Sequence, residues 1–449
     1  MNKEPTLNLG FLFFLYAATV AVVIQFIFLP YVFPSWSAGH GLVNSSLDSI
    51  TFHREAVGMA QAIHRQGWSV WELGPQNQWP IGIAAAIYAL TVPEPWTLIP
   101  LNAFLHAISG LLVLKIVMFF LPDWRKAFWC ALPFVVYPSA ASWYAQLHKD
   151  GYSILGLLLL VYGVLILAHD VLNAEPGHGA AKGLLLVFFG AWLMWVVRPY
   201  LFNFSKLATS LLAVVLGFFM ICGCLRRKVG LRACLEKSAV LLLLFMMPLA
   251  GTSAKKIYDL FPALTLERPT AGLATLEDVL ATAVPPAGPS PAREGIDKKI
   301  IRMRTGFIGA NANAKSAVDN EAVFNDLQDI ILYLPRAAQI VFLAPFPEDW
   351  FKEGSFEANT LMRRVAGAEM LGVYFALCFL PFAAFFWARH FEFWIMILFC
   401  SGLLVLHGLV VNNVGTLYRM RYGLLMLIVA LGMAGFVQFL EVRRKKCAA

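Results

Sequence analysis

Long apolar runs separated by short polar segments extend along almost the whole chain. An apolar run of about 20 residues is long enough to cross the hydrocarbon core of a bilayer as a helix. The pattern predicts about ten membrane-spanning helices, at residues 9–30, 98–121, 127–143, 151–168, 183–198, 202–224, 238–252, 367–388, 391–412 and 422–440. The first run is too long for a signal-peptide core and lacks a small-residue cleavage pattern, so we expect it to be retained as a helix.

For two further apolar runs, the predicted topology decides whether they cross the membrane. The run at 81–92 is too short to cross a bilayer, and the run at 330–345 is interrupted by Pro335 and Arg336. If neither crosses and the N-terminus is inside, the basic loops and the basic tail at 443–446 all face the cytoplasm, as the positive-inside rule requires. We therefore predict that both runs are interfacial or re-entrant segments.

The composition agrees with one all-α polytopic membrane domain covering residues 1–449. Hydrophobic residues make up 59% of the chain, charged residues make up 14%, and the mean hydropathy is +0.68, which excludes an ordinary soluble protein. The net charge of +8 lies largely in short basic loops, where it orients the helices, and no nucleic-acid-binding motif is present. The cysteines fall within spans or inside, so we expect no external disulfide and no cysteine metal site.

This topology places two large loops on the external face, at 31–97 and 253–366. In the first loop, apolar residues at helical spacing predict an amphipathic helix from Asp48 to Gly67 that lies flat on the membrane. The second loop has a flexible proline-rich middle, followed by helical patterns at 296–303 and 316–332.

The last part of the second loop has the pattern of a lid that touches the membrane. Its apolar stretch from Tyr333 is broken by prolines and ends at Trp350. We assign Glu348 and Asp349 to an exposed turn rather than to a metal site.

The first loop carries three candidate functional residues. Asp48 could act as a general base or as the N-cap of a helix that starts at Ser49, and the two roles are compatible. His53 is a candidate ligand or an interfacial polar contact, and Glu55 is a candidate ligand or part of a solvated face.

A short external turn groups further ionisable residues at the membrane surface. His148, Lys149 and Asp150 follow one another between two predicted spans, where such groups are costly unless they are used or paired. Asp150 is also favourable as a charge at a helix N-terminus. Arg198 ends another span on the same side, where it could bind substrate or extend to the interface.

The junction at 412–422 is the densest polar segment next to a predicted span on the external side. Arg419 and Arg421 are suited to hold a lipid phosphate through bidentate hydrogen bonds. At a spacing of two they diverge on a helix, so that only one would reach the ligand. Tyr418 and, from the second loop, Arg336 complete the candidate substrate-binding residues.

The order of these elements resembles the GT-C membrane glycosyltransferases and the related bacterial O-antigen and exopolysaccharide polymerases and ligases. The resemblance rests on Asp48 after the first span, the interfacial helix, the segments 76–88 and 100–106, and Asp150. It covers most of the chain with loose motifs. The acidic pair common in the family is absent, since Leu47 and Ser49 flank Asp48.

The resemblance implies sugar transfer from a polyprenyl-phosphate-linked donor to a glycan, lipid or protein acceptor on the external face of a bacterial inner membrane. It implies that Asp48 is the first-loop acid and Asp150 the second-loop acid, and it allows a divalent metal without naming ligands. Both termini are expected in the cytoplasm.

The chemistry of glycosyl transfer agrees with the residues on this face. Asp48 would accept the proton of the acceptor hydroxyl, in an external cavity that also contains the 148–150 turn and the Arg419 junction. Basic side chains would neutralise the departing lipid phosphate, with Lys149, Arg198, Arg336, Arg419 and Arg421 as the candidates.

Two other functions stay open at this stage. The first is a polymerase or ligase that transfers a whole diphosphate-linked glycan and uses His53 or His148. The second is a transporter or flippase for a lipid-linked sugar, which would require charges in the middle of the spans. The sequence offers few such charges: Lys115 lies near a helix end, and His106 and His407 are isolated histidines.

Overall fold

The computed structural model describes residues 5–75, 78–172, 179–198, 214, 217, 295–311, 314–355 and 357–448. The chain forms two compact units. The first unit comprises Met1–Leu266, Ala376–Cys400 and Met426–Ala449, and the second comprises Glu267–Phe375 and Ser401–Leu425. The predicted spans at 202–224 and 238–252, apart from Val214 and Gly217, lie outside the described residues, as does the proline-rich part of the second loop.

The described residues are helical and contain no β-strand, only two isolated β-bridges. Seven of their helices are long and apolar enough to cross a membrane. These are Thr6–Val32, Pro95–Phe120, Asp150–Asp170, Gly179–Val197, Glu357–Phe386, Phe391–Val410 and Val414–Cys447. They coincide with seven of the predicted spans and confirm an all-α, multi-pass membrane protein.

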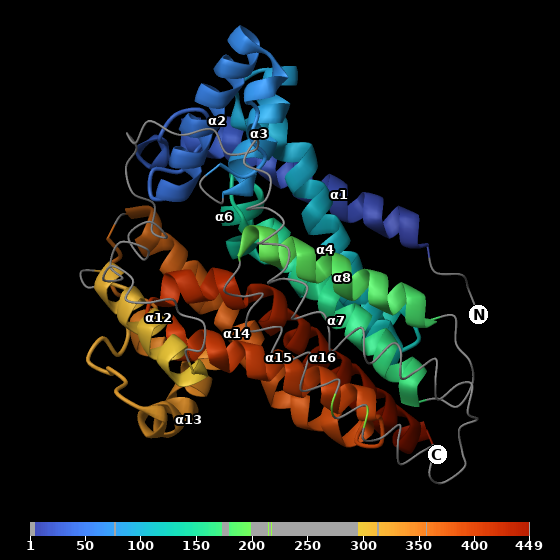
Figure 1. Ribbon diagram of the computed structural model, residues 1–449. Helices are drawn as coiled ribbons and strands as arrows, with labels where there is room; N and C mark the ends of the chain where they lie inside the picture. Colours follow the sequence, from blue (N-terminus) through green and yellow to red (C-terminus); the bar gives the residue numbers. More distant parts are fainter. Residues whose placement is uncertain are drawn as a thin grey trace. The chain divides into compact units, whose positions relative to one another are not determined.

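The first unit contains the elements from α1 to α8, and Figure 1 shows them from blue to green. Their bounds are α1 Thr6–Val23, η1 Ile24–Val32, η2 Pro34–Trp36, α2 Leu47–Gln66, η3 Trp68–Val70, α3 Trp79–Leu90, η5 Pro95–Leu98, α4 Ile99–Phe120, α5 Trp124–Val136, η6 Pro138–Ala140, α6 Ala141–Tyr144, α7 Asp150–Leu172 and α8 Gly179–Val197.

The predicted span at 127–143 is not one continuous helix. It is divided into α5 and α6 by the Tyr137–Pro138 step, because proline disfavours a helical conformation in the residue before it. The broken segment still returns along α4. His106 of α4 bonds the carbonyl of Val135 at 3.1 Å, and Asn102 bonds the carbonyl of Gln146 at 2.9 Å. The chain thus reaches the start of α7 at the same end of α4 at which α4 began.

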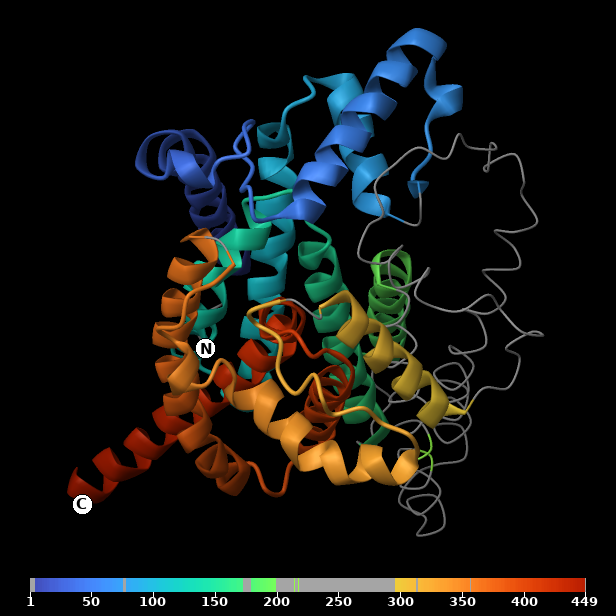
Figure 2. The ribbon, with the colours of Figure 1, turned by 90° about the vertical axis from the view of Figure 1, so that its left-hand side faces the viewer.

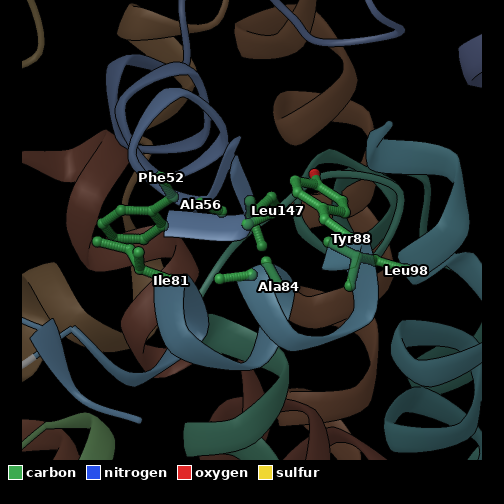
Figure 3. Packing of buried hydrophobic residues seen from close by; sticks show 9 residues of the cluster. Phe52, Ala56, Ile81, Ala84, Tyr88, Leu98 and Leu147 are labelled. Carbon is green, nitrogen blue, oxygen red and sulfur yellow. The ribbon is translucent and has the colours of Figure 1, made fainter. Parts of the chain in front are cut away.

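Helices α2 and α3 form a hairpin in the first loop, seen beside each other in Figure 1. Phe52 and Ala56 of α2 face Ile81 and Ala84 of α3 in a buried apolar cluster (Figure 3). The apolar face of α2, predicted to lie on the membrane, is therefore covered by α3, because the run at 81–92 supplies a partner surface. That run forms a 12-residue helix, too short to span, as predicted.

Helices α7 and α8 pack closely along their length, as both ribbon views show (Figures 1 and 2). A Cβ atom placed on Gly190 would lie 2.5 Å from the carbonyl oxygen of Gly156, and one on Gly163 would lie 2.8 Å from the carbonyl oxygen of Gly183. Small residues let the two backbones approach, as is common between helices in membranes.

The second unit contains α12, α13 and adjoining parts of three long helices. The bounds are α12 Ile296–Ala310, α13 Leu327–Leu343, η8 Pro347–Asp349, α14 Glu357–Phe386, α15 Phe391–Val410 and α16 Val414–Ala448. The helix expected at 316–332 is wrong for 316–326, a region of turns that hydrogen-bonds to the 412–414 junction, for example from Val318 N to Asn412 O at 2.7 Å.

The apolar stretch around Pro335, expected to be broken by prolines, forms part of one helix, α13. It continues through Pro335, which lies at an exposed position. Water can satisfy the carbonyl that the proline leaves without a donor, so the helix need not end there. Helix α13 is not among the described helices that are long and apolar enough to span a membrane, and its interfacial or re-entrant placement stays a prediction.

Candidate functional site

The first loop and the 146–150 turn meet in the first unit, as the shared membrane face predicts. The buried side chain of Gln146 donates to the carbonyl of Gly41 at 3.0 Å and accepts from the amide of Val43 at 3.0 Å. Gly41 has a φ of 71°, a left-handed conformation that glycine adopts without strain. Gln146 therefore fixes the loop just before α2 begins.

His148 links the same turn to the start of α2. The His148 ring is 5% exposed, and its Nε2 lies 2.9 Å from the hydroxyl of Ser46. Ser46 Oγ in turn lies 2.7 Å from Ser49 Oγ. Ser46 is the N-cap residue of α2 and Ser49 lies in its first turn. A hydrogen-bonded chain thus runs from His148 to the N-terminus of α2.

Asp150 and Arg198 form a buried ion pair beside His148. Asp150 is 1% exposed and begins α7, whereas Arg198 is 5% exposed and directly follows α8. The guanidinium Nη2 of Arg198 donates to Asp150 Oδ1, and His148 Nδ1 lies 3.8 Å from Asp150 Oδ2. Arg198 therefore does not simply extend to the interface, because its charge is used inside the protein.

Asp48 lies in the same turn of α2 as the two serines. The helix begins at Leu47, two residues before the predicted start at Ser49, and its N-cap is Ser46. The N-cap role considered for Asp48 is therefore wrong, but its carboxylate is half-buried in the first helical turn, where the helix dipole favours a negative charge. Lys149 is also half-buried.

The structure gives His53 a polar contact with α3. His53 Nδ1 lies 3.1 Å from the hydroxyl of Tyr88 in α3, and its ring is 5.2 Å from that of His40. Burial lowers the pKa of His53, His40 lowers it further, and the carboxylate of Glu94 acts in the opposite sense. A neutral imidazole is a weak phosphate ligand, so the polar-contact role fits His53 better. Glu55 is half-buried on the same helix.

Arg421 is used inside the second unit. It is 1% exposed and donates to the carbonyls of Ile340, Val341 and Ala344 at the end of α13, with the Val341 contact at 2.7 Å. Its guanidinium also lies over the Tyr418 ring. These bonds reach carbonyls at the C-terminus of α13, where a helix leaves most of its last carbonyls without a backbone donor, so the structure makes Arg421 a structural residue rather than a phosphate ligand.

We expect Arg421→Lys to lower the free energy of unfolding by about 2 kcal/mol, since an ammonium cannot reproduce the planar set of hydrogen bonds. Arg444→Lys, at an exposed position of the same helix, is the matched control and should be neutral. Thermal unfolding of both variants in detergent tests this, and equal melting temperatures would contradict the structural role.

Arg419 lies apart from Arg421, as expected for a spacing of two on a helix. The junction is helical from Val414, so Gly415 and Thr416 lie in the first turn of α16, with Asn413 Oδ1 accepting from Thr416 N at 3.1 Å. Arg419 is half-buried. Its binding to a phosphate stays a prediction.

Tyr418 is engaged within the second unit. It donates to Oε2 of the buried Glu369 at 2.7 Å. A tyrosine that satisfies a buried carboxylate in this way stabilises the contact between α16 and α14, so this bond accounts for the polar atom of Tyr418 without a substrate.

Arg336 holds a carboxylate that the sequence did not single out. Its Nε and Nη2 donate to the two oxygens of Asp319 at 2.9 and 3.1 Å, and Tyr333 donates to Asp319 Oδ2 at 2.8 Å. Hydrogen bonding by Arg336 lowers the pKa of Asp319, and burial raises the pKa of Tyr333 to about 12. The 1% exposed guanidinium of Arg304 donates to the Asp319 carbonyl at 3.0 Å.

Because of the Asp319 contact, the free energy of unfolding should depend on pH in the acidic range. A carboxyl whose folded pKa is lowered stabilises the protein above the unfolded pKa of about 3.9 and loses that contribution as pH falls through the folded pKa. The effect should be small, because the Arg336 side chain is 39% exposed.

We expect wild type to be more stable than Asp319→Asn near neutral pH, and the difference to shrink below about pH 4. Asparagine tolerates the φ of 51° at this position, so the comparison isolates the charge. Melting temperatures over a pH series measure it, and a constant difference would contradict the assignment.

The contacts that the sequence reading missed involve neutral or distant partners. Gln146 and Asp319 gave no signal because glutamine and aspartate are common in loops, and only the fold reveals their partners. The capping preference of serine was a usable signal for Ser46.

Among the described residues, no group of three or more His, Cys, Asp or Glu side chains could hold a metal ion. The chain matches no protein-family model, no curated protein and no solved structure. The function must therefore be argued from the chemistry of the residues themselves.

Proposed function

We propose that the protein is a GT-C-type membrane glycosyltransferase. It moves a sugar from a polyprenyl-phosphate-linked donor to a glycan, lipid or protein acceptor. The reaction takes place on the external face of a bacterial cytoplasmic membrane, with both termini of the chain in the cytoplasm. The proposed site is formed within the first unit by the start of α2, the 146–150 turn and the end of α8.

One observation carries this proposal: the hydrogen bond between His148 and Ser46 joins the first loop to a buried ion pair at the ends of two membrane helices. Burial of charge is costly unless the charges are paired or used. Asp150 thus lies beside both His148 and Arg198, and Lys149 stands between His148 and Asp150 in the sequence, which supports acid–base chemistry on an anionic lipid.

In the proposed reaction, Asp48 accepts the proton of the acceptor hydroxyl as its oxygen bonds to the anomeric carbon of the sugar. The bond from that carbon to the phosphate oxygen breaks, and the lipid phosphate leaves with the electron pair. Lys149 and Arg198 stabilise its negative charge, while Asp150 positions Arg198. The N-termini of α2 and α7 add favourable partial positive charge.

The test is reconstitution of the purified full chain in liposomes with a polyprenyl-phosphate-linked monosaccharide carrying a labelled sugar. Transfer of label to an acceptor supports the proposal. Movement of the labelled lipid across the bilayer without transfer would instead indicate a transporter, and absence of both would refute both functions.

A polymerase or ligase is the second candidate, because His148 is buried in hydrogen-bond contact with Ser46 and could serve as its acid–base group. The two enzymes differ in the lipid-linked intermediate that accumulates when the gene is deleted. A single sugar on the lipid supports the monosaccharide transferase, and an oligosaccharide unit supports the polymerase or ligase.

The proposed orientation has its own test in a cysteine-free version of the chain. His40 and Arg389 are both exposed. In the proposed topology, His40→Cys reacts with an impermeant thiol reagent in intact cells and Arg389→Cys reacts only after permeabilisation. The reverse pattern would place the site in the cytoplasm.

A further inference from the structure

A narrow apolar groove lies in the first unit next to the polar cluster. Its volume is about 210 Å³, and aliphatic and aromatic side chains line it. It is formed between the start of α3 and the adjoining ends of α7 and α8. Its walls include Trp79 and Ile83 of α3, Tyr152 of α7, and Trp192, Val196 and Val197 of α8.

One end of the groove adjoins the buried ion pair. Tyr152 follows Asp150 by two residues on α7, and Val197 immediately precedes Arg198 at the end of α8. A hydrocarbon chain in the groove would therefore end beside the side chains that we propose to hold the phosphate.

One wall residue of the groove, Trp192, also lies on an exposed apolar face of α8. Trp192 is 40% exposed, and Leu185 and Phe188 on the same helix are 69% and 64% exposed. The Trp79 and Trp192 rings pack edge to face at 6.0 Å and form an aromatic wall. Because α8 is apolar enough to span the membrane, a lipid chain could enter from the bilayer without crossing water.

We propose that this groove holds the part of the polyprenyl chain next to the phosphate of the lipid-linked donor. This inference rests on the proposed glycosyltransferase function. A polyprenyl phosphate has one chain beside its phosphate, whereas a phospholipid has two. A groove of this volume, below the range of about 300–1,000 Å³ typical of ligand pockets, accommodates part of one chain only.

The groove would position the donor more than it would attract it. A chain that moves from the bilayer into an apolar groove leaves one hydrocarbon environment for another, so little hydrophobic free energy is gained. What the groove adds is orientation, since a chain held between α3 and α8 directs the phosphate toward Arg198. Orientation of this kind can contribute strongly to rate.

The experiment uses the full chain in detergent with a polyprenyl phosphate that carries a photoreactive group on its first isoprene units. We expect label on peptides from α3 and α8 that line the groove. Unlabelled polyprenyl phosphate should compete for labelling, and excess phosphatidylglycerol should not.

Ile83→Trp fills the groove and should reduce labelling about tenfold. Leu185→Trp introduces the same side chain on the exposed face of α8, outside the groove, and should leave labelling unchanged.

Labelling of other peptides would overturn the groove assignment. Equal competition by phosphatidylglycerol would also overturn it and would identify a site for ordinary bilayer lipid. The two proposals can fail separately. Groove labelling without sugar transfer refutes the glycosyltransferase and keeps the lipid site. Sugar transfer with an unlabelled groove refutes the lipid site and keeps the enzyme.

Discussion

Asp48→Asn should lower the turnover number for sugar transfer by about 10²–10⁴-fold, the usual contribution of a positioned general base. An amide has nearly the shape of the carboxylate but cannot accept the proton of the acceptor hydroxyl. Because Asp48 acts on the acceptor in the proposed reaction, the KM for the lipid-linked donor should change little. Steady-state kinetics with the reconstituted full chain separate the two parameters.

The matched control is Arg65→Gln, which changes a charge at the exposed far end of the same helix and should leave the turnover number unchanged. Asp48→Glu keeps the carboxylate and should retain part of the activity. Full activity of Asp48→Asn at normal protein levels would remove the base assignment. If His148→Gln were then inactive, the chemistry would be that of the polymerase or ligase.

Breaking the buried pair of Asp150 and Arg198 should have the largest effect on stability. Asp150→Asn removes the carboxylate charge that pairs with the buried guanidinium of Arg198, and Arg198→Met removes the charge that pairs with the carboxylate. Each substitution should lower the free energy of unfolding by about 3–5 kcal/mol. The double variant removes both charges and should lose much less than the sum of the two.

An exposed ion pair provides the comparison. Lys352 Nζ lies 2.7 Å from Asp349 Oδ1, with the lysine side chain 61% exposed. Asp349→Asn should therefore have little measurable effect on the melting temperature. Thermal unfolding in detergent measures all four variants. If the losses at Asp150 and Arg198 were additive, the two side chains would not act as a pair.

The helices were predictable because lipid leaves the chain few alternatives. A backbone in hydrocarbon must satisfy its own polar groups, so an apolar run of spanning length forms a helix almost regardless of its detailed sequence. Topology could likewise be used to exclude 81–92 and 330–345 as spans. Pro138, where the run at 127–143 is broken, is also visible in the sequence, although the length of the run favours a single span.

The partners of the polar residues were less predictable. That the first loop would approach the 146–150 turn followed from the shared membrane face, but the Ser46 and His148 contact joins residues 102 positions apart. Nothing local in the sequence specifies such a pair. Arg421 shows the same limit: its place on one face of α16 was predictable, but the α13 carbonyls that it binds were not.

The amphipathic pattern of α2 predicted the helix but did not identify the surface that covers its apolar face. An apolar stripe must be covered, and lipid or protein can cover it equally well. In the structure the cover is α3, with Phe52 and Ile81 both 1% exposed. Pattern alone cannot distinguish these cases, because the run that supplies the cover lies in another segment.

The glycine contacts between α7 and α8 set the spacing of the two helices at depths of about 9 Å and about 20 Å below Asp150, taking 1.5 Å of rise per residue from Asp150 to Gly156 and to Gly163. A methyl group at either level would force the helices apart. Because Asp150 begins one helix and Arg198 follows the other, that separation would widen the gap between acid and base. The distance between the two charged side chains thus depends on glycines, which carry neither a charge nor a side chain.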